Sequence, residues 1–150
     1  MKIVIQRVSE AAVSINKEQF SRIQKGLVVL VGIELEDESE DADWLVSKLV
    51  QLRIFSDTEG KMNDSILDNA GELLIISQFT LHAATKKGNR PSFIAAARPE
   101  KAIPLYEYFI AQATKQLPGK VKTGIFGADM KVSLVNDGPV TIIIDSKNKV

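Results

Sequence analysis

Runs of apolar residues predict that the first third of the chain forms β-strands. Four segments have the length and apolar content of strands, and Asn16 and Lys17 form a turn after the second. These segments are residues 2–8, 12–15, 19–24 and 27–33. Because residues 27–33 are apolar at nearly every position, we expect them to form a central strand covered on both faces.

A stripe of apolar residues with i, i+3, i+4, i+7 spacing predicts a first helix that ends near Arg53. The stripe consists of Ala42, Leu45, Val46, Leu49 and Leu52. An acidic segment, residues 34–43, leads into this helix, and negative charge is favourable at a helix N-terminus. Its spacing shows no defined set of metal ligands, so we predict a helix start and no metal site.

A second helix is predicted over residues 99–116. Pro99 suits the first helical position, and Pro118-Gly119 ends the helix. Its apolar face is formed by Tyr106, Phe109, Ile110, Ala113 and Leu117. Further strands are predicted over residues 73–81, 121–126, 131–136 and 140–144. Strands and helices do not alternate regularly, so we predict an α+β fold with a mixed, largely antiparallel sheet, in one domain spanning residues 1–150.

Composition removes several kinds of chemistry. The chain of 150 residues contains no cysteine and one histidine, His82, which excludes thiol nucleophiles, disulfides and Cys- or His-rich metal sites. The 19 basic and 19 acidic side chains give no net charge. This balance argues against wholesale wrapping of nucleic acid and leaves room for a local basic patch. We expect no cofactor.

No segment has the features of a signal peptide or a membrane span. The apolar stretch at the start is interrupted at Gln6-Arg7, and no later apolar run approaches the roughly 18 residues that a span needs. We therefore expect a cytoplasmic protein with no membrane partner.

The predicted buried strand at residues 73–81 becomes polar toward its end, where sites often form. Ser77, Gln78 and Thr80 offer two hydroxyls and an amide. If the strand continues, Gln78, Thr80 and His82 share one face, which permits Thr80 as a nucleophile with His82 as its base. Main-chain N–H groups that stabilise developing negative charge are an equally plausible contribution from this segment.

Two further segments carry candidate chemistry. Asp137-Gly138 suggests a tight turn between strands, but Pro139 has no N–H for a strand ladder, and the residues alone do not decide between a cis and a trans proline. Lys86, Lys87 and Arg90 form a basic loop shortly after Ser77. Such a triplet is either solvated surface charge or a contact for a phosphate backbone.

Taken together, these motifs resemble the D-aminoacyl-tRNA deacylase family. The resemblance is carried by several segments in the right order and covers essentially the whole chain. They are Ile5-Gln6-Arg7-Val8, Leu52-Arg53-Ile54-Phe55, Ser77-Gln78-Phe79-Thr80-Leu81, Arg90-Pro91-Ser92-Phe93, Thr123-Gly124-Ile125-Phe126-Gly127-Ala128-Asp129-Met130 and Asn136-Asp137-Gly138-Pro139-Val140-Thr141.

The resemblance implies a barrel-like sheet with two main helices and a homodimer with active sites at the subunit interface. It implies an enzyme that hydrolyses the ester between a D-amino acid, or glycine, and the 3′ end of tRNA. The catalytic pocket is then formed by Ser77, Gln78, Phe79 and Thr80, with main-chain N–H groups near Phe79 and Thr80 holding the substrate carbonyl.

The same resemblance assigns chiral selection to a Gly-cisPro element, Gly138 and Pro139, which enters the partner's pocket, with Arg7 fixing it. The run from Phe126 to Met130 resembles the part of the family that borders the terminal adenosine, and Lys86, Lys87 and Arg90 of the basic loop are the further residues that we expect to contact tRNA. Catalysis assisted by the 2′-hydroxyl of the tRNA needs no protein nucleophile. A covalent role for Thr80 ranks second, and a non-catalytic RNA-binding module that uses the basic loop ranks third.

Overall fold

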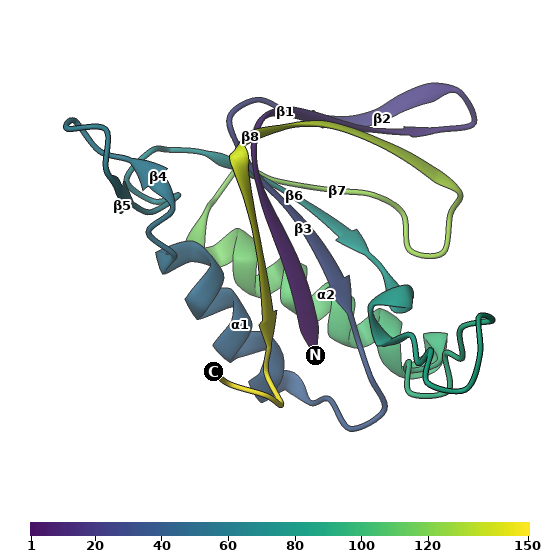
Figure 1. Cartoon of the computed structure of the whole chain (residues 1–150). Helices are drawn as coiled ribbons and strands as arrows, with labels where there is room; N and C mark the ends of the chain where they lie inside the picture. Colours follow the sequence, from purple (N-terminus) through teal and green to yellow (C-terminus); the bar gives the residue numbers. More distant parts are fainter.

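A computed structural model describes residues 1–150 and shows one curved sheet packed against two helices (Figure 1). The main sheet contains β1 (Lys2–Ile15), β2 (Glu18–Ile23), β3 (Gly26–Gly32), β6 (Glu72–Ser77), β7 (Val121–Thr123) and β8 (Met130–Asp145). A small second sheet pairs β4 (Phe55–Ser56) with β5 (Met62–Asp64). The helices are α1 (Ser39–Gln51), α2 (Pro99–Gln116) and the short 3₁₀ helix η1 (Phe79–His82).

Strand β1 organises the sheet because it has different neighbours along its two halves. Its first half lies between β3 and the end of β8, and its second half lies between β2 and the start of β8. All three pairings are antiparallel, whereas β3–β6 and β6–β7 are parallel. The bending of β1 and β8 curls the sheet until it is nearly closed (Figure 1). The predicted α+β class, with a mixed, largely antiparallel and barrel-like sheet, is confirmed.

Strand β3 has the two covered faces that its apolar sequence predicts. Leu27, Val29 and Val31 belong to the larger core cluster, which the helices cover. Val28 faces the other way, into a smaller cluster with residues of β1, β2 and β6. Side chains alternate across a strand, so a continuous apolar run serves two cores at once.

Both predicted helices are present, and both contribute to the larger core. Ala42, Leu45, Val46 and Leu49 of α1 are buried, as are Tyr106, Phe109 and Ala113 of α2. The acidic start of α1 forms a capping box in which the Glu38 N–H donates to the Asp41 carboxylate at 2.9 Å. No helix is both long and apolar enough to cross a membrane.

Several predicted strands have the wrong boundaries, and the predicted strands 2–8 and 12–15 form one strand, β1. The strand predicted over residues 73–81 ends at Ser77, because the chain turns into η1 after the Gln78 N–H donates to the Val31 carbonyl at 2.8 Å. The strand predicted over residues 121–126 ends at Thr123, before a loop in which Gly127 has a positive φ of 75°. Residues 131–136 and 140–144 belong to one strand, β8, because β1 pairs with it on both sides of the Gly138-Pro139 bend.

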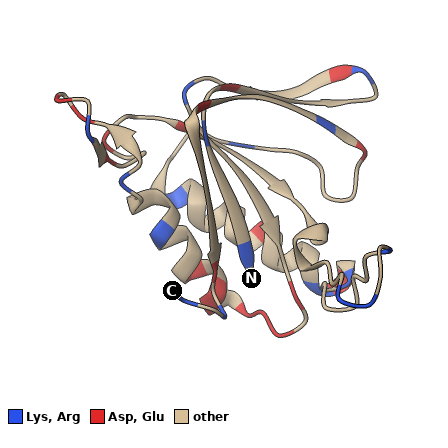
Figure 2. Cartoon of the chain, viewed as in Figure 1, with Lys and Arg blue, Asp and Glu red and all other residues tan.

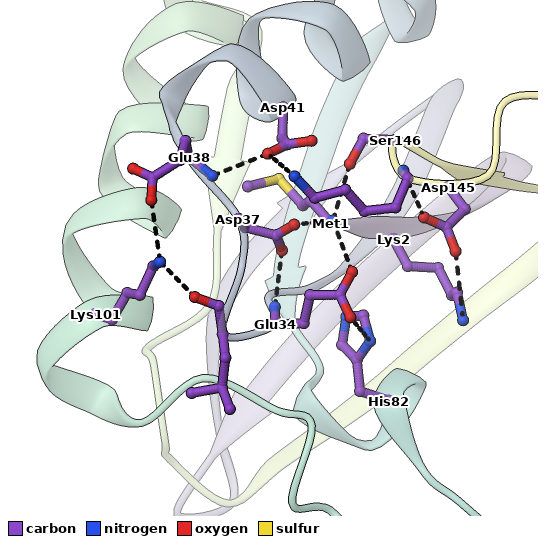
Figure 3. Close-up of polar contacts among 12 residues, drawn as sticks. Met1, Lys2, Glu34, Asp37, Glu38, Asp41, His82, Lys101, Asp145 and Ser146 are labelled. Carbon is purple, nitrogen blue, oxygen red and sulfur yellow. Dashed lines mark hydrogen bonds and ion pairs between the residues drawn. The ribbon is translucent and has the colours of Figure 1, made fainter.

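The C-terminal segment is tied to the start of α1 through Asp41. The Asp41 carboxylate accepts a hydrogen bond from Lys147 Nζ at 2.8 Å. Next to this contact, the buried Met1 ammonium contacts Asp37 and Ser146 (Figure 3). Partial burial raises the pKa of Asp41, but the hydrogen bonds from Lys147 and from the Glu38 N–H outweigh it and lower the pKa to about 2. The carboxylate therefore stabilises the folded chain.

We predict that Asp41→Asn lowers the free energy of unfolding by about 1 kcal/mol at neutral pH, a value discounted because Lys147 reaches solvent. A lowered folded-state pKa stabilises above the unfolded value of 3.8, and this contribution is lost as the pH falls toward about 2. Urea unfolding at a series of pH values should show the gap between wild type and variant closing in that range. Glu59→Gln, at an exposed pair, is the control, and a gap independent of pH would contradict this role of Asp41.

Candidate active site

A cleft of about 310 Å³ opens where β3 and β6 end. Its walls come from Val31 and Ile33 on one side, Ser77, Gln78 and Phe79 in the middle, and residues 126–130 on the other. The last residues of the parallel pair β3–β6 therefore lie beside the loop that follows β7. This arrangement brings the predicted residues Phe126 and Met130 together with the Ser77–Phe79 segment.

Helix η1 leaves two main-chain N–H groups free at the edge of the cleft. The first N–H groups of a helix have no acceptor within it. The Gln78 N–H donates to the Val31 carbonyl, and the Leu81 N–H donates to the Gln78 carbonyl. The N–H groups of Phe79 and Thr80 have no hydrogen-bond partner in the chain. Two neighbouring free donors beside a cleft can bind one acceptor oxygen.

The predicted sharing of one strand face by Thr80 and His82 is wrong. The alternation that would align them ends with β6 at Ser77, and η1 places Thr80 in solvent and His82 in the interior. The Thr80 hydroxyl makes one hydrogen bond, accepting from the Gln78 amide at 2.6 Å. It therefore has no imidazole base within hydrogen-bond reach.

His82, the last residue of η1, instead turns its side chain into the interior and anchors the helix there. Its side chain is 5% exposed, and Nδ1 lies 3.8 Å from the Glu34 carboxylate, which also lies 3.7 Å from the Met1 ammonium (Figure 3). The Glu34 N–H donates to Asp37 at 2.7 Å, so this polar group continues into the loop before α1. The acidic segment predicted as a helix start thus has a second structural contact, with the histidine beneath the site.

Gly32 and Tyr106 also shape the cleft, although the sequence did not predict a role at the site for either residue. A Cβ on Gly32 would lie 2.9 Å from Leu81 Cβ and 3.0 Å from the Gln78 carbonyl oxygen. The buried Tyr106 hydroxyl donates to the Ile75 carbonyl at 2.9 Å, and its ring packs on Phe126 with centroids 5.8 Å apart. The glycine between apolar residues of the β3 run was the available signal; nothing in the pattern of α2 distinguishes Tyr106 from an ordinary core residue.

Gly138 and Pro139 lie outside the cleft, at an interruption of the β1–β8 pairing. Gln6 pairs with Thr141 and Val8 with Asn136, so residues 137–140 all lie opposite Arg7. We call the exposed residues 137–139 the arch. The Gly138–Pro139 bond is cis, and Gly138 has a φ of 152°.

Arg7 holds one end of the arch. Its side chain is only 12% exposed, and Nε donates to the Asp137 carbonyl at 2.7 Å. Nη1 donates to the Ile54 carbonyl at 2.6 Å, which joins the arch to the segment between α1 and β4. None of the residues lining the cleft belongs to the arch, so one chain keeps these two predicted parts of the site apart.

The predicted basic loop is exposed and lies between η1 and α2. Lys86, Lys87 and Arg90 are all exposed, and an antiparallel bridge between Ala84 and Ser92 closes the loop at its base. Figure 2 shows basic residues on this loop and acidic residues gathered in the segment that leads into α1. The chain has no net charge, yet its charge is unevenly distributed around the cleft.

Comparison with known proteins agrees with this arrangement. The family model described as D-Tyr-tRNA(Tyr) deacylase matches residues 4–145. The chain belongs to the D-aminoacyl-tRNA deacylase family. Proteins named D-aminoacyl-tRNA deacylase from Flavobacterium psychrophilum and Cytophaga hutchinsonii are 62% and 63% identical to it, each over 99% of both chains.

Solved structures show the same fold. A structure titled c-Myc DNA Unwinding Element Binding Protein superposes with a TM-score of 0.93 at 44% identity, over 97% of this chain and 98% of the other. A probable eukaryotic D-amino acid tRNA deacylase superposes with a TM-score of 0.80 at 17% identity, over 95% and 97% of the two chains. Family membership makes this chain a hydrolase acting on aminoacyl-tRNA and disfavours the non-catalytic RNA-binding module.

We predict that Gly32→Ala displaces η1, because its methyl group meets Leu81 and the Gln78 carbonyl. Overpacking of this kind costs about 1–3 kcal/mol of stability, and the shift of η1 should lower deacylation by about 10- to 100-fold. Gly60→Ala is the control, since nothing lies within 4 Å of its added methyl group, although Gly60, unlike Gly32, has a positive φ of 78°.

Thermal unfolding and single-turnover deacylation measured on both glycine variants separate stability from activity. We expect Gly60→Ala to lose some stability through backbone strain and to keep its activity. Deacylation by Gly32→Ala at the wild-type rate would show that the close packing of η1 on β3 is not needed for the reaction.

Proposed function

We propose that this deacylase removes D-amino acids and glycine from tRNA in a site completed by a second copy of the chain. A water oxygen bonds to the ester carbonyl carbon, the bond from that carbon to the ribose 3′ oxygen breaks, and a water proton passes to the 3′ oxygen, so that free amino acid and intact tRNA are released. An aminoacyl ester is already activated, and the neighbouring 2′-hydroxyl of the ribose assists the attack. The protein then has to position the ester and stabilise charge.

The pair of free N–H groups on Phe79 and Thr80 carries this proposal. An ester carbonyl oxygen gains negative charge when its carbon is attacked, and preformed N–H donors stabilise that charge without reorganising. Both donors lie on η1, which Gly32 and the buried His82 hold against β3. Ser77 and Gln78 complete this side of the pocket, and none of the four residues has to supply a nucleophile.

Chiral selection is assigned to the arch of the partner subunit. In this proposal the carbonyl groups of Gly138 and Pro139 accept hydrogen bonds from the substrate amino group and leave no space for a side chain in the L configuration. A steric clash rejects a competitor more strongly than a lost attraction would. Glycine has no side chain to reject, so the same pocket also accepts glycyl-tRNA.

Two observations support the homodimer that this proposal needs. The arch and the cleft are separate within one chain, so a complete site needs an arch from elsewhere. Large apolar side chains are also exposed on the strands, among them Phe20 at 50%, Val135 at 51% and Ile143 at 65%. Where such side chains form a contiguous patch, they mark an interaction face.

The tRNA itself is assigned to the rim of the cleft. Lys86, Lys87 and Arg90 form an exposed cationic loop directly after η1, where they can pair with phosphate groups of the acceptor end. Phe126 and Met130 line the far wall, next to the position assigned to the terminal adenosine. In this proposal the reaction takes place in the cytoplasm, together with aminoacylated tRNA.

Incubation with matched D-, L- and glycyl-tRNA tests the proposed selectivity, and we expect release from the D- and glycyl-forms only. Gly138→Ala should lower the D/L rate ratio by about tenfold or more, since a repositioned arch loses both capture and exclusion. Its methyl group would lie 2.7 Å from Val140 Cγ2 and 3.2 Å from Arg7 Nη2. Equal rates on both enantiomers with wild type would refute chiral selection, and an unchanged ratio in the variant would refute the role of Gly138.

The source of the nucleophile is tested with tRNA that ends in a 2′-deoxy ribose. Assistance by the 2′-hydroxyl predicts that rapid cleavage disappears on this substrate, and that Thr80→Ala stays within about threefold of wild type on normal tRNA, because its hydroxyl has no base. The second-ranked mechanism, with Thr80 as nucleophile, predicts that cleavage persists on the 2′-deoxy substrate and that Thr80→Ala loses its activity on normal tRNA. Single-turnover rates under one set of conditions distinguish the two.

A further inference from the structure

The two ends of the arch are joined by a side chain that the proposed mechanism has not used. Asn136 precedes the arch and Val140 follows it. The Asn136 Oδ1 accepts from the Val140 N–H at 2.8 Å, and Nδ2 donates to the Thr141 hydroxyl at 3.1 Å and to the Val140 carbonyl at 3.4 Å. One amide therefore spans the bend and binds the chain on its far side.

These contacts replace strand pairing that is missing at this place. Residues 137–140 have no partners in the register of β1 against β8, and Pro139 has no N–H to donate. Asn136 itself pairs with Val8, so it stands on a fixed strand. The Val140 N–H, which would otherwise lack its strand partner, is satisfied by the Asn136 amide.

Movement of Val140 would be transmitted directly to the tip of the arch. A Cβ built on Gly138 would lie 2.8 Å from the Val140 nitrogen and 2.7 Å from its Cγ2, so these two residues are in close contact. Val140 is half-buried and packs against the larger core cluster. On the other side, Arg7 holds Asp137, through its carbonyl at 2.7 Å and its carboxylate at 4.0 Å, and no hydrogen bond or ion pair joins Arg7 to Val140. Position at the Val140 end therefore depends on Asn136.

We propose that Asn136 is a positioning residue for chiral selection: its amide fixes the spacing between the two ends of the arch and thereby the direction of the Gly138 and Pro139 carbonyls. This inference rests on the proposed function, in which those carbonyls recognise the substrate amino group. Asn136 does not touch substrate. Its removal should change which substrates are accepted more than it changes the stability of the chain.

The experiment compares Asn136→Ala, which loses all three contacts, with Asn136→Asp, which keeps the acceptor for the Val140 N–H. Rates on D- and L-aminoacyl-tRNA, and KM for the D-form, are measured for both variants and for wild type. Losing these three hydrogen bonds should reduce the D/L ratio of Asn136→Ala by about tenfold. Asn136→Asp should stay within about threefold of wild type. Asn148→Ala, at an exposed asparagine beyond β8, is the control for the substitution itself.

The failures of the two proposals are distinguishable. A wild-type enzyme that does not discriminate enantiomers defeats the proposed function, whereas a discriminating wild type with an unchanged ratio and KM in Asn136→Ala overturns only the role of Asn136. A folded Asn136→Asp that loses as much discrimination as the alanine variant also overturns it. If Asn136→Ala does not fold, Asn136→Ser, whose hydroxyl is too short to reach Val140, takes its place with the same expectations.

Discussion

The antiparallel pairing of β1 with β8 is the constraint on which the rest of the molecule depends. It runs from Lys2 opposite Asp145 to Ile15 opposite Met130, and so it defines the curvature of the sheet. The same pairing is interrupted opposite Arg7, where residues 137–140 leave the ladder. The ladder on each side holds the ends of the interruption, and an exposed segment with no strand partners is thereby kept in one place.

The cleft depends on a second backbone arrangement, at the other end of the sheet. Parallel pairing of β3 with β6 brings Val31 opposite Ser77, and the chain can turn into η1 at that point because Gly32 has no side chain. The free N–H groups of Phe79 and Thr80 are a consequence of this turn. Both parts of the proposed site are thus main-chain features, placed by strand pairing and made possible by glycines.

This dependence on the main chain explains which features the sequence could predict. Apolar periodicity reports burial, and it correctly indicated α1, α2, the doubly covered β3 and the class of the sheet. It could not indicate that the strand after Glu72 ends at Ser77, because Phe79 and Leu81 continue an apolar alternation into η1. Because the strand ends at Ser77, His82 is not a partner of Thr80, and its side chain is buried beside Glu34.

The same reasoning applies to the arch. Asp137-Gly138-Pro139 has the composition of a turn, and a local reading divides the C-terminal region into two strands. Only β1, which ends 115 residues before β8 begins, makes β8 a single strand by pairing with it on both sides of the bend. The contacts of Arg7 with Asp137 and of Asn136 with Val140 follow from that long-range pairing. A local pattern of residues does not contain this information. The resemblance to the family therefore indicated a role for Gly138 and Pro139, whereas the pattern alone did not decide their conformation.

The proposed site, made of backbone groups, is consistent with the composition of the chain. An oxyanion bound by N–H groups and an amino group bound by carbonyls need no cysteine, no metal and no acid–base pair, since the peptide backbone supplies donors and acceptors at every residue except proline. What such a site requires of the side chains is rigidity. Three side chains hold main-chain segments by hydrogen bonds or packing: the buried His82 within η1, Tyr106 against Ile75 and Arg7 against Asp137. The residues that matter most for the chemistry are then those that fix the path of the chain.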